Sequence, residues 1–290
     1  MIFDPGFTDV LRDVLPGLGD FFFLFTQLGS TLFYVVALLI AYWAYNKREA
    51  IILTCVLIVS IFTEYYLKVI IAKDRPPASN WHPSADPPNY STPSGHAQNS
   101  ATLYGWLTSR IRTWWMAFIA VILVGMIGVS RIYLGVHYLG DVLLGWAVGI
   151  VLVTLFVYLE KPAREYLSRY QTEHLLLVFL FVGFLLTLIA AVLPQPPNDN
   201  LGAYGGLAMG FAIGLILERR FVNFTNEPYD KQMWRLVLRV VFGLLLVISV
   251  MYGLAFILPT EEIWLRALRY CLVAVTGIFV WPAIFKKVKL

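Results

Sequence analysis

The sequence predicts an all-α protein in which a bundle of transmembrane helices makes up most of the chain. Three observations support this fold class: the composition, a series of long apolar runs, and the position of the basic residues between those runs. Hydrophobic residues make up 59% of the 290 residues and charged residues only 14%, whereas about a quarter of the residues of a soluble domain are charged. The mean hydropathy of +0.72 agrees with a polytopic membrane protein.

The apolar runs predict about nine spans, because each crossing of a bilayer takes roughly 20 residues. They lie near residues 21–45, 51–71, 94–109, 113–130, 137–159, 175–193, 201–218, 235–258 and 263–285. The chain is therefore expected to contain an interfacial N-terminal segment (1–20), a core of helices that carries the polar clusters described below (21–160), and additional C-terminal transmembrane helices (161–290).

Basic residues occupy every second connection between the runs, and such connections usually face the cytoplasm. They are Lys47 and Arg48, then Arg110 and Arg112, then Lys161, Arg164 and Arg169, then Arg219, Arg220 and Lys231, and finally Lys286, Lys287 and Lys289. The N-terminus is therefore predicted outside and the C-terminus inside. The basic residues form short groups and no single stripe, which argues against a nucleic-acid partner.

Two polar clusters lie beside the second and third runs, where ionisable side chains are costly and indicate function. In the first, Lys68 and Arg75 are seven residues apart, or two helical turns, so both side chains are predicted to face the same point. The second is Pro93-Ser94-Gly95-His96. It is predicted to open a helix whose first amides are free to bind an anion.

A third polar cluster begins at Ser130-Arg131 and continues to His137 and Asp141. On a helix, residues four apart share a face, so Asp141 can orient the imidazole of His137. Arg131 presents a planar cation suited to phosphate. Taken alone, a His and an Asp at this spacing more often form a structural hydrogen bond than a catalytic pair.

Together the three clusters resemble the signature of the type 2 phosphatidic acid phosphatase superfamily, the membrane relatives of vanadium haloperoxidases. Eleven residues match in order and spacing, within roughly residues 60–150. The resemblance implies a phosphatase that uses no metal or other cofactor and is inhibited by vanadate. It implies that His137 forms a phosphohistidine, that Asp141 stabilises it, and that His96 protonates the leaving oxygen. The residues expected to bind the phosphate are Lys68, Arg75, Arg131, Ser94 and Gly95.

The resemblance leaves the substrate open. A lipid phosphate or diphosphate of the phosphatidate, prenyl diphosphate or sphingoid phosphate type is favoured, because the helices after residue 160 add membrane surface. A nine-span layout is also similar to the glucose-6-phosphatase branch, so a soluble sugar phosphate is the alternative. A transporter or scramblase is the alternative from another class. The expected location is the plasma membrane or an endomembrane, with the site facing the periplasm, exterior or lumen.

Three further features of the sequence predict how parts of the chain are placed. The third run contains Gln98, Asn99, Ser100 and Thr102 and should therefore lie inside the bundle. The seventh has a ridge of small residues, which favours packing within the chain, although an oligomer could also use it: Gly202, Gly206, Gly210 and Gly214. The proline-rich stretch 76–93 is either a lid over the site, in which His82 could reach the pocket, or an exposed connector.

Overall fold

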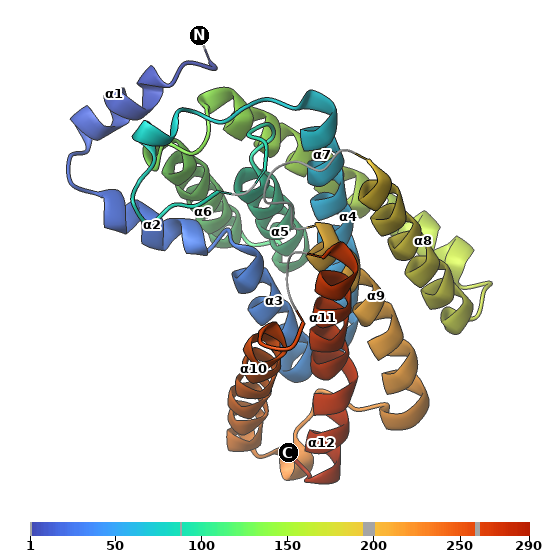
Figure 1. The fold of residues 1–290 in the computed structure, drawn as a ribbon. Coiled ribbons are helices and arrows are strands. Elements are labelled where there is room, and N and C mark those ends of the chain that lie inside the picture. The colour runs from blue at the N-terminus through green and yellow to red at the C-terminus, as the bar shows by residue number, and fades with distance from the viewer. Residues whose placement is uncertain (1, 88, 194–200, 259–261) are drawn as a thin grey trace. The chain divides into compact units, whose positions relative to one another are not determined.

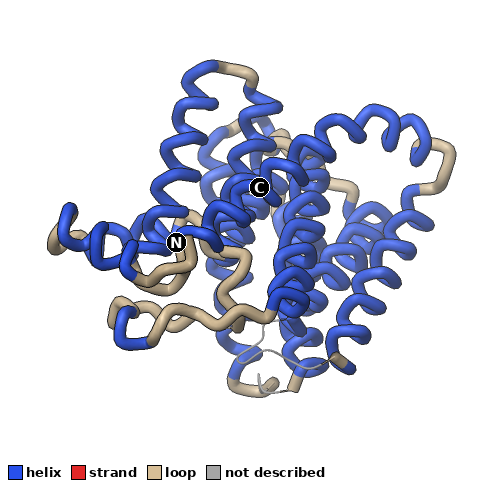
Figure 2. Tube along the Cα trace, turned by 90° about the horizontal axis from the view of Figure 1, so that it is seen from above, coloured by secondary structure: helices blue, strands red, loops and turns tan. Residues whose placement is uncertain are grey.

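The computed structural model describes residues 2–87, 89–193, 201–258 and 262–290, and within these ranges it contains helices and loops but no strand (Figure 1; Figure 2). The predicted all-α class is confirmed. The chain divides into two compact units. Among the described residues, the first unit holds 2–35 and Cys55–Pro162, and the second holds Val36–Thr54, 163–193 and everything from 201 onward.

The helices follow the apolar runs of the sequence. In order they are α1 (Gly6–Val14), α2 (Gly19–Gln27), α3 (Thr31–Ile40), α4 (Lys47–Ile71), α5 (Gly95–Ile111), α6 (Trp114–Tyr133), α7 (Leu139–Leu167), α8 (Thr172–Val192), α9 (Leu201–Leu217), α10 (Met233–Ala255), α11 (Ile263–Val275) and α12 (Trp281–Lys287). Short π-helical segments extend α3 and α9 and join α11 to α12: Ala41–Tyr45, Glu218–Val222 and Thr276–Val280.

Seven spans within the described residues are long and apolar enough to cross a membrane: α4, α6, α7, α8, α9 with its extension, α10, and α11 with α12. The α2–α3 pair makes an eighth if its 44° bend lies within one span. The remaining expected span is α5, which has 17 residues and is short for a crossing of roughly 20 residues. Within the described ranges, seven or eight of the nine expected spans are therefore supported, and the count of nine stays a prediction.

α5 is buried inside the first unit, as its polar side chains predicted. The side chains of Gln98, Ser100 and Thr102 are all 0% exposed. Gln98 Nε2 donates to the carbonyl oxygen of Ser60 on α4 at 2.7 Å, and Ser60 Oγ donates to Asn99 Oδ1 at 2.7 Å. Lipid offers no such partners, so these hydrogen bonds explain why the polar face of α5 turns toward α4.

Two glycines of α7 allow this helix to approach α5 closely. A Cβ atom at Gly145 would lie 2.7 Å from the carbonyl oxygen of Ser94, and one at Gly149 would collide with the carbonyl oxygen of Gln98. The approach brings the first turn of α7 to the start of α5, where the amide of Ser94 donates to the carbonyl oxygen of Asp141 at 3.0 Å. Helix packing thus joins the second and third polar clusters.

We expect Gly149→Ala to lower the stability of the protein by about 1–3 kcal/mol, a typical cost of overpacking. The added methyl group would meet backbone, which cannot rotate away as a side chain can. The measurement is the thermal unfolding midpoint in detergent. Gly125→Ala on α6 is the matched control, because a Cβ there meets nothing within 4 Å. Equal midpoints for the two variants would contradict the close packing of α5 and α7.

In the second unit, α9 packs against α8 and α11. Added Cβ atoms on the glycine ridge of α9 would meet residues of α11 and its extension, namely Ile263 and Arg266 from Gly202, Ala267 from Gly206, Cys271 and Ala274 from Gly210, and Val275 and Ile278 from Gly214. All four ridge glycines are buried. The ridge therefore serves packing within the chain, as favoured, and the expected alternative of an oligomer through it is not supported because α11 covers it.

Candidate active site

The third polar cluster lies around the turn that joins α6 to α7. α6 ends at Tyr133 and α7 begins at Leu139, so His137 precedes the helix that was predicted to include it. Asp141 Oδ2 accepts a hydrogen bond from the amide of Tyr138 at 2.9 Å, an acidic side chain reaching back to the helix start as in a capping box. The same oxygen lies 3.3 Å from His137 Nδ1. The expected His137–Asp141 pair is present, but the helix cap produces it.

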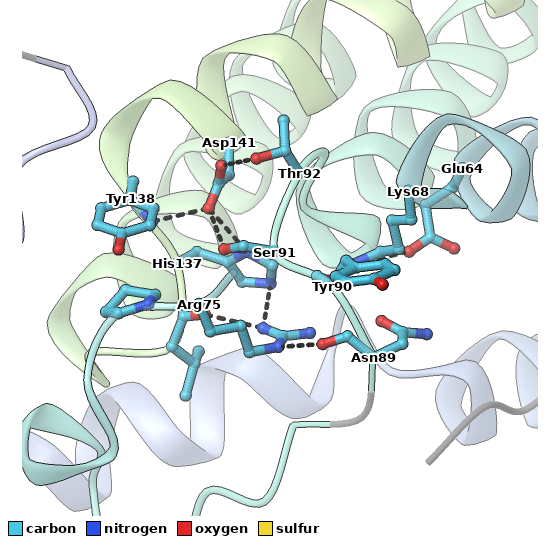
Figure 3. A network of polar contacts seen from close by, with 12 residues as sticks. Glu64, Lys68, Arg75, Asn89, Tyr90, Ser91, Thr92, His137, Tyr138 and Asp141 are labelled. Atoms are coloured by element: carbon cyan, nitrogen blue, oxygen red, sulfur yellow. Dashed lines mark hydrogen bonds and ion pairs between the residues drawn. The ribbon is translucent and has the colours of Figure 1, made fainter. Parts of the chain in front are cut away.

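The ring of His137 is buried, and its two nitrogens face different partners (Figure 3). Nε2 lies 3.2 Å from Nη1 of Arg75. A guanidinium can only donate hydrogen bonds, so Nε2 is the acceptor and the ring proton lies on Nδ1, toward Asp141. Burial and, next, the charge of Arg75 hold the pKa of His137 well below its usual value. The ring is therefore neutral at pH 7, with the lone pair on Nε2.

Arg75 reaches the site from a loop, so the predicted two-turn helical arrangement with Lys68 is wrong. α4 ends at Ile71, and Ala72 has a φ of +48°, a left-handed conformation that commonly terminates helices. Beyond it, Arg75 donates to the carbonyl oxygens of Val136 at 2.8 Å and Asn89 at 2.9 Å. Burial lowers the pKa of Arg75 to about 10, so the guanidinium keeps its charge at pH 7.

Lys68 lies in the last turn of α4 and is 2% exposed. Its Nζ donates to the carbonyl oxygen of Tyr90 and lies 3.4 Å from Oε1 of Glu64. A Cβ at Gly95 would come within 2.7 Å of the same Glu64 oxygen. The buried Glu64 carboxylate, which was not predicted from the sequence, therefore lies between Lys68 and the start of α5, and glycine at position 95 makes room for it.

Arg131 is buried at the end of α6 and donates from Nη1 to Oγ1 of Thr26 on α2 at 2.8 Å. Its charge acts on Arg75 and on His96. Its Nε has no hydrogen-bond partner within the described part of the chain. Arg131 thus adds a third cation to the same region and retains donor capacity there.

The second polar cluster opens α5, as predicted, with Ser94 just before the first helical residue, Gly95. The amide of Ser94 was expected to be free for an anion and is instead used by the carbonyl oxygen of Asp141. Ser94 Oγ is buried without a hydrogen-bond partner among the described residues. His96 interacts electrostatically with Arg131, His137, Arg75 and Lys68. The structure therefore brings all eight predicted site residues into one region of the first unit.

Two further residues of the site, Ser91 and Thr92, were not predicted from the sequence. Ser91 Oγ donates to Asp141 Oδ2 and lies 3.4 Å from His137 Nδ1. Thr92 Oγ1 donates to the other oxygen, Asp141 Oδ1, at 2.5 Å (Figure 3). The only signal was a pair of hydroxyl residues before Pro93, and such residues are common in loops. Their role became visible only when Asp141 was placed beside them.

The described residues of the loop between α4 and α5 are bonded to their surroundings at several points. The amide of Ser91 donates to the carbonyl oxygen of Lys73 at 2.8 Å, and the amide of His82 donates to that of Leu134 at 2.9 Å. The ring of His82 stacks on Phe23 and its Nε2 lies 3.8 Å from Asp20 Oδ1. His82 is thus directed toward α2. The loop side chains that reach His137 and Asp141 are those of Arg75, Ser91 and Thr92.

The chain matches two family models. A model of the PAP2 superfamily matches residues 49–165, and a model described as the PAP2 superfamily phosphatase, transmembrane extension, matches residues 202–290.

Curated relatives and a solved structure are also similar to this chain. It is 22% identical over 215 residues to lipid phosphate phosphatase delta of Arabidopsis thaliana, covering 68% of this chain and 51% of that protein. It is 30% identical over 118 residues to phosphatidylglycerophosphatase B of Bacillus subtilis (strain 168), covering 37% of this chain and 54% of that protein. The chain thus spans about half the length of the curated relatives it matches. A crystal structure of a transmembrane PAP2 type phosphatidylglycerolphosphate phosphatase from Bacillus subtilis has 23% identity and a TM-score of 0.47, covering 55% of this chain and 84% of that one.

Proposed function

Since this chain belongs to the PAP2 superfamily of phosphatases, we propose that it removes phosphate from a membrane lipid through a phosphohistidine on His137. The observation that carries the proposal is the buried, neutral imidazole, with Nδ1 toward Asp141 and Nε2 beside the guanidinium of Arg75. The names of the two curated relatives, a lipid phosphate phosphatase and a phosphatidylglycerophosphatase, support a lipid phosphate as the substrate.

In the first step, Nε2 of His137 attacks the phosphorus and the bond to the leaving oxygen breaks. Arg75 turns from Nε2 to the phosphate and, with Lys68 and Arg131, neutralises the nonbridging oxygens, as phosphoryl transfer requires. Asp141 accepts the Nδ1 hydrogen bond and stabilises the positive charge that develops on the ring.

The leaving oxygen takes its proton from His96. A bound phosphate dianion places negative charge beside His96, which favours the protonated form that can donate. Ser94 and Gly95, at the start of α5, complete the phosphate site in this proposal.

In the second step, His96, now neutral, takes a proton from a water molecule whose oxygen attacks the phosphorus. The bond between phosphorus and Nε2 breaks and its electron pair returns to the ring. At the end of this step His137 is again neutral and His96 is again protonated, and phosphate then leaves. The cycle thus consumes one water and needs no cofactor.

We place the reaction at the outer membrane face. The positive-inside rule puts the basic connections in the cytoplasm. The ends of α4 and α6 and the starts of α5 and α7, which carry the site, then lie on the opposite side. In this proposal residues 21–160 perform the chemistry, and the helices in 161–290 add membrane surface.

A phosphate-release panel tests the proposal. The purified protein, with a metal chelator present, should hydrolyse phosphatidate, a prenyl diphosphate or a sphingoid phosphate faster than glucose 6-phosphate. Preference for glucose 6-phosphate would support the sugar-phosphate alternative. Strict dependence on an added divalent metal would contradict the mechanism, because histidine, water and fixed cations would no longer suffice.

A further inference from the structure

We infer that Ser91 is a positioning residue for the His137–Asp141 pair, a role that rests on the proposed function. Ser91 is 0% exposed, and its hydroxyl contacts both the ring of His137 and the carboxylate of Asp141. Its hydroxyl donates to Asp141 Oδ2, and its oxygen lies 3.4 Å from Nδ1 of His137 (Figure 3). A hydroxyl has one proton to give and lone pairs to receive another. Ser91 can therefore hold the carboxylate and accept from the Nδ1 proton at once.

The position of this hydroxyl is set by the cations of the site. Residues 89–92 each make a contact there: the carbonyl oxygen of Asn89 accepts from Arg75, that of Tyr90 accepts from Lys68, and the hydroxyls of Ser91 and Thr92 donate to Asp141. The amide of Ser91 is also held, by the carbonyl oxygen of Lys73 at 2.8 Å. The segment 89–92 thus bridges the phosphate-binding side chains and the His–Asp pair.

The two hydroxyls act on different oxygens of the carboxylate. Thr92 binds Oδ1 at 2.5 Å, whereas Ser91 and the amide of Tyr138 share Oδ2 with the ring of His137. Hydrogen bonds donated to Oδ2 partly neutralise its negative charge and so weaken its electrostatic effect on His137. Loss of the Ser91 hydroxyl should therefore affect His137 directly, in its orientation and in its affinity for a proton.

The charged groups that act on His137 are Arg75, Asp141 and Lys68, and His96 lies within the same electrostatic range. Arg75 and Lys68 favour the neutral ring, and Asp141 favours the protonated one. In Ser91→Ala the influence of Asp141 grows, so the pKa of His137 rises toward its usual value. Because only the neutral ring attacks phosphorus, the acid limb of kcat/KM should move to higher pH.

The test is the pH profile of phosphate release from a short-chain phosphatidate in detergent micelles. Ser91→Ala should lower kcat roughly tenfold or more with little change in KM, and should move the acid limb up by about half a pH unit or more. The ionisation of the substrate is the same for every variant, so a difference between variants belongs to the protein. Ser91→Thr keeps a hydroxyl and should restore the limb.

Ser100→Ala is the matched control, since Ser100 is equally buried but donates to Ala97 within α5. Its acid limb should match that of the wild type. If Ser91→Ala does not fold, Ser91→Cys takes its place, because a thiol of similar size is a weak donor. An acid limb that stays at the wild-type pH in Ser91→Ala (or in Ser91→Cys, where it replaces Ser91→Ala), or that moves equally in Ser100→Ala, overturns the inference. A wild-type protein that releases no phosphate fails the proposed function instead.

Discussion

Replacing His137 with alanine is expected to lower kcat for phosphate release by about 10⁴-fold or more, as removal of a nucleophile does in other covalent enzymes. In the proposed mechanism Nε2 of His137 bonds to phosphorus, so no phosphorylated intermediate can form without the ring. The measurement uses a substrate labelled in its phosphate. Wild-type protein quenched during turnover should carry an acid-labile, alkali-stable label, as expected of phosphohistidine, and the variant should carry none.

His82→Ala is the control for this prediction. His82 belongs to the loop above the site, but its ring stacks on Phe23 and has no role in the proposed steps, so its variant should remain active. Full activity of His137→Ala would refute the phosphohistidine. Together with lipid or solute movement that does not depend on His137, it would favour the transporter or scramblase alternative.

Replacing His96 with alanine is expected to lower kcat on an alkyl phosphate about 10²- to 10⁴-fold, the usual contribution of a general acid. An alkoxide leaves poorly without a proton, whereas a nitrophenolate leaves readily on its own. The loss should therefore be much smaller on 4-nitrophenyl phosphate. Steady-state rates of wild type and variant on the two substrates provide the measurement.

His137→Ala serves as the comparison in the same experiment, because a good leaving group cannot replace a missing nucleophile and should not rescue it. Equal losses of His96→Ala on alkyl and aryl substrates would remove the general-acid assignment. His96 would then be a phosphate-binding residue, placed among Arg131, Arg75 and Lys68 by its position in the first turn of α5.

Motif spacing predicted which residues meet, and it was less reliable on how they meet. Lys68 and Arg75 do reach the same region, but the chain leaves the helix at Ile71 and Arg75 arrives from the loop. His137 and Asp141 do pair, but through the cap of α7 and not on one helical face. In both cases the apolar run did not show the helix boundary. One left-handed residue decides where α4 ends, and one capping side chain decides where α7 begins.

Polar residues inside an apolar run gave a reliable prediction of burial. The polar side chains of α5 face inward because lipid offers them no hydrogen-bond partners. The sequence did not predict which helix they would pack against. The glycine ridge of α9 was correctly assigned to packing within the chain, against α11. Small residues at helical spacing identify a contact face, but the sequence does not name the surface that covers it.

By itself, the sequence determined the membrane-embedded all-α class and the three polar clusters, because hydropathy and motif spacing are properties of short stretches of chain. Only the tertiary structure decided that the Nδ1 proton of His137 faces Asp141, that Arg75 caps Nε2, and that Ser91 and Thr92 hold the carboxylate. Ser91 and Asp141 are 50 positions apart. Glycines on α7 allow it to pack against the start of α5, close to the segment that holds Ser91, and that fit depends on both helices at once.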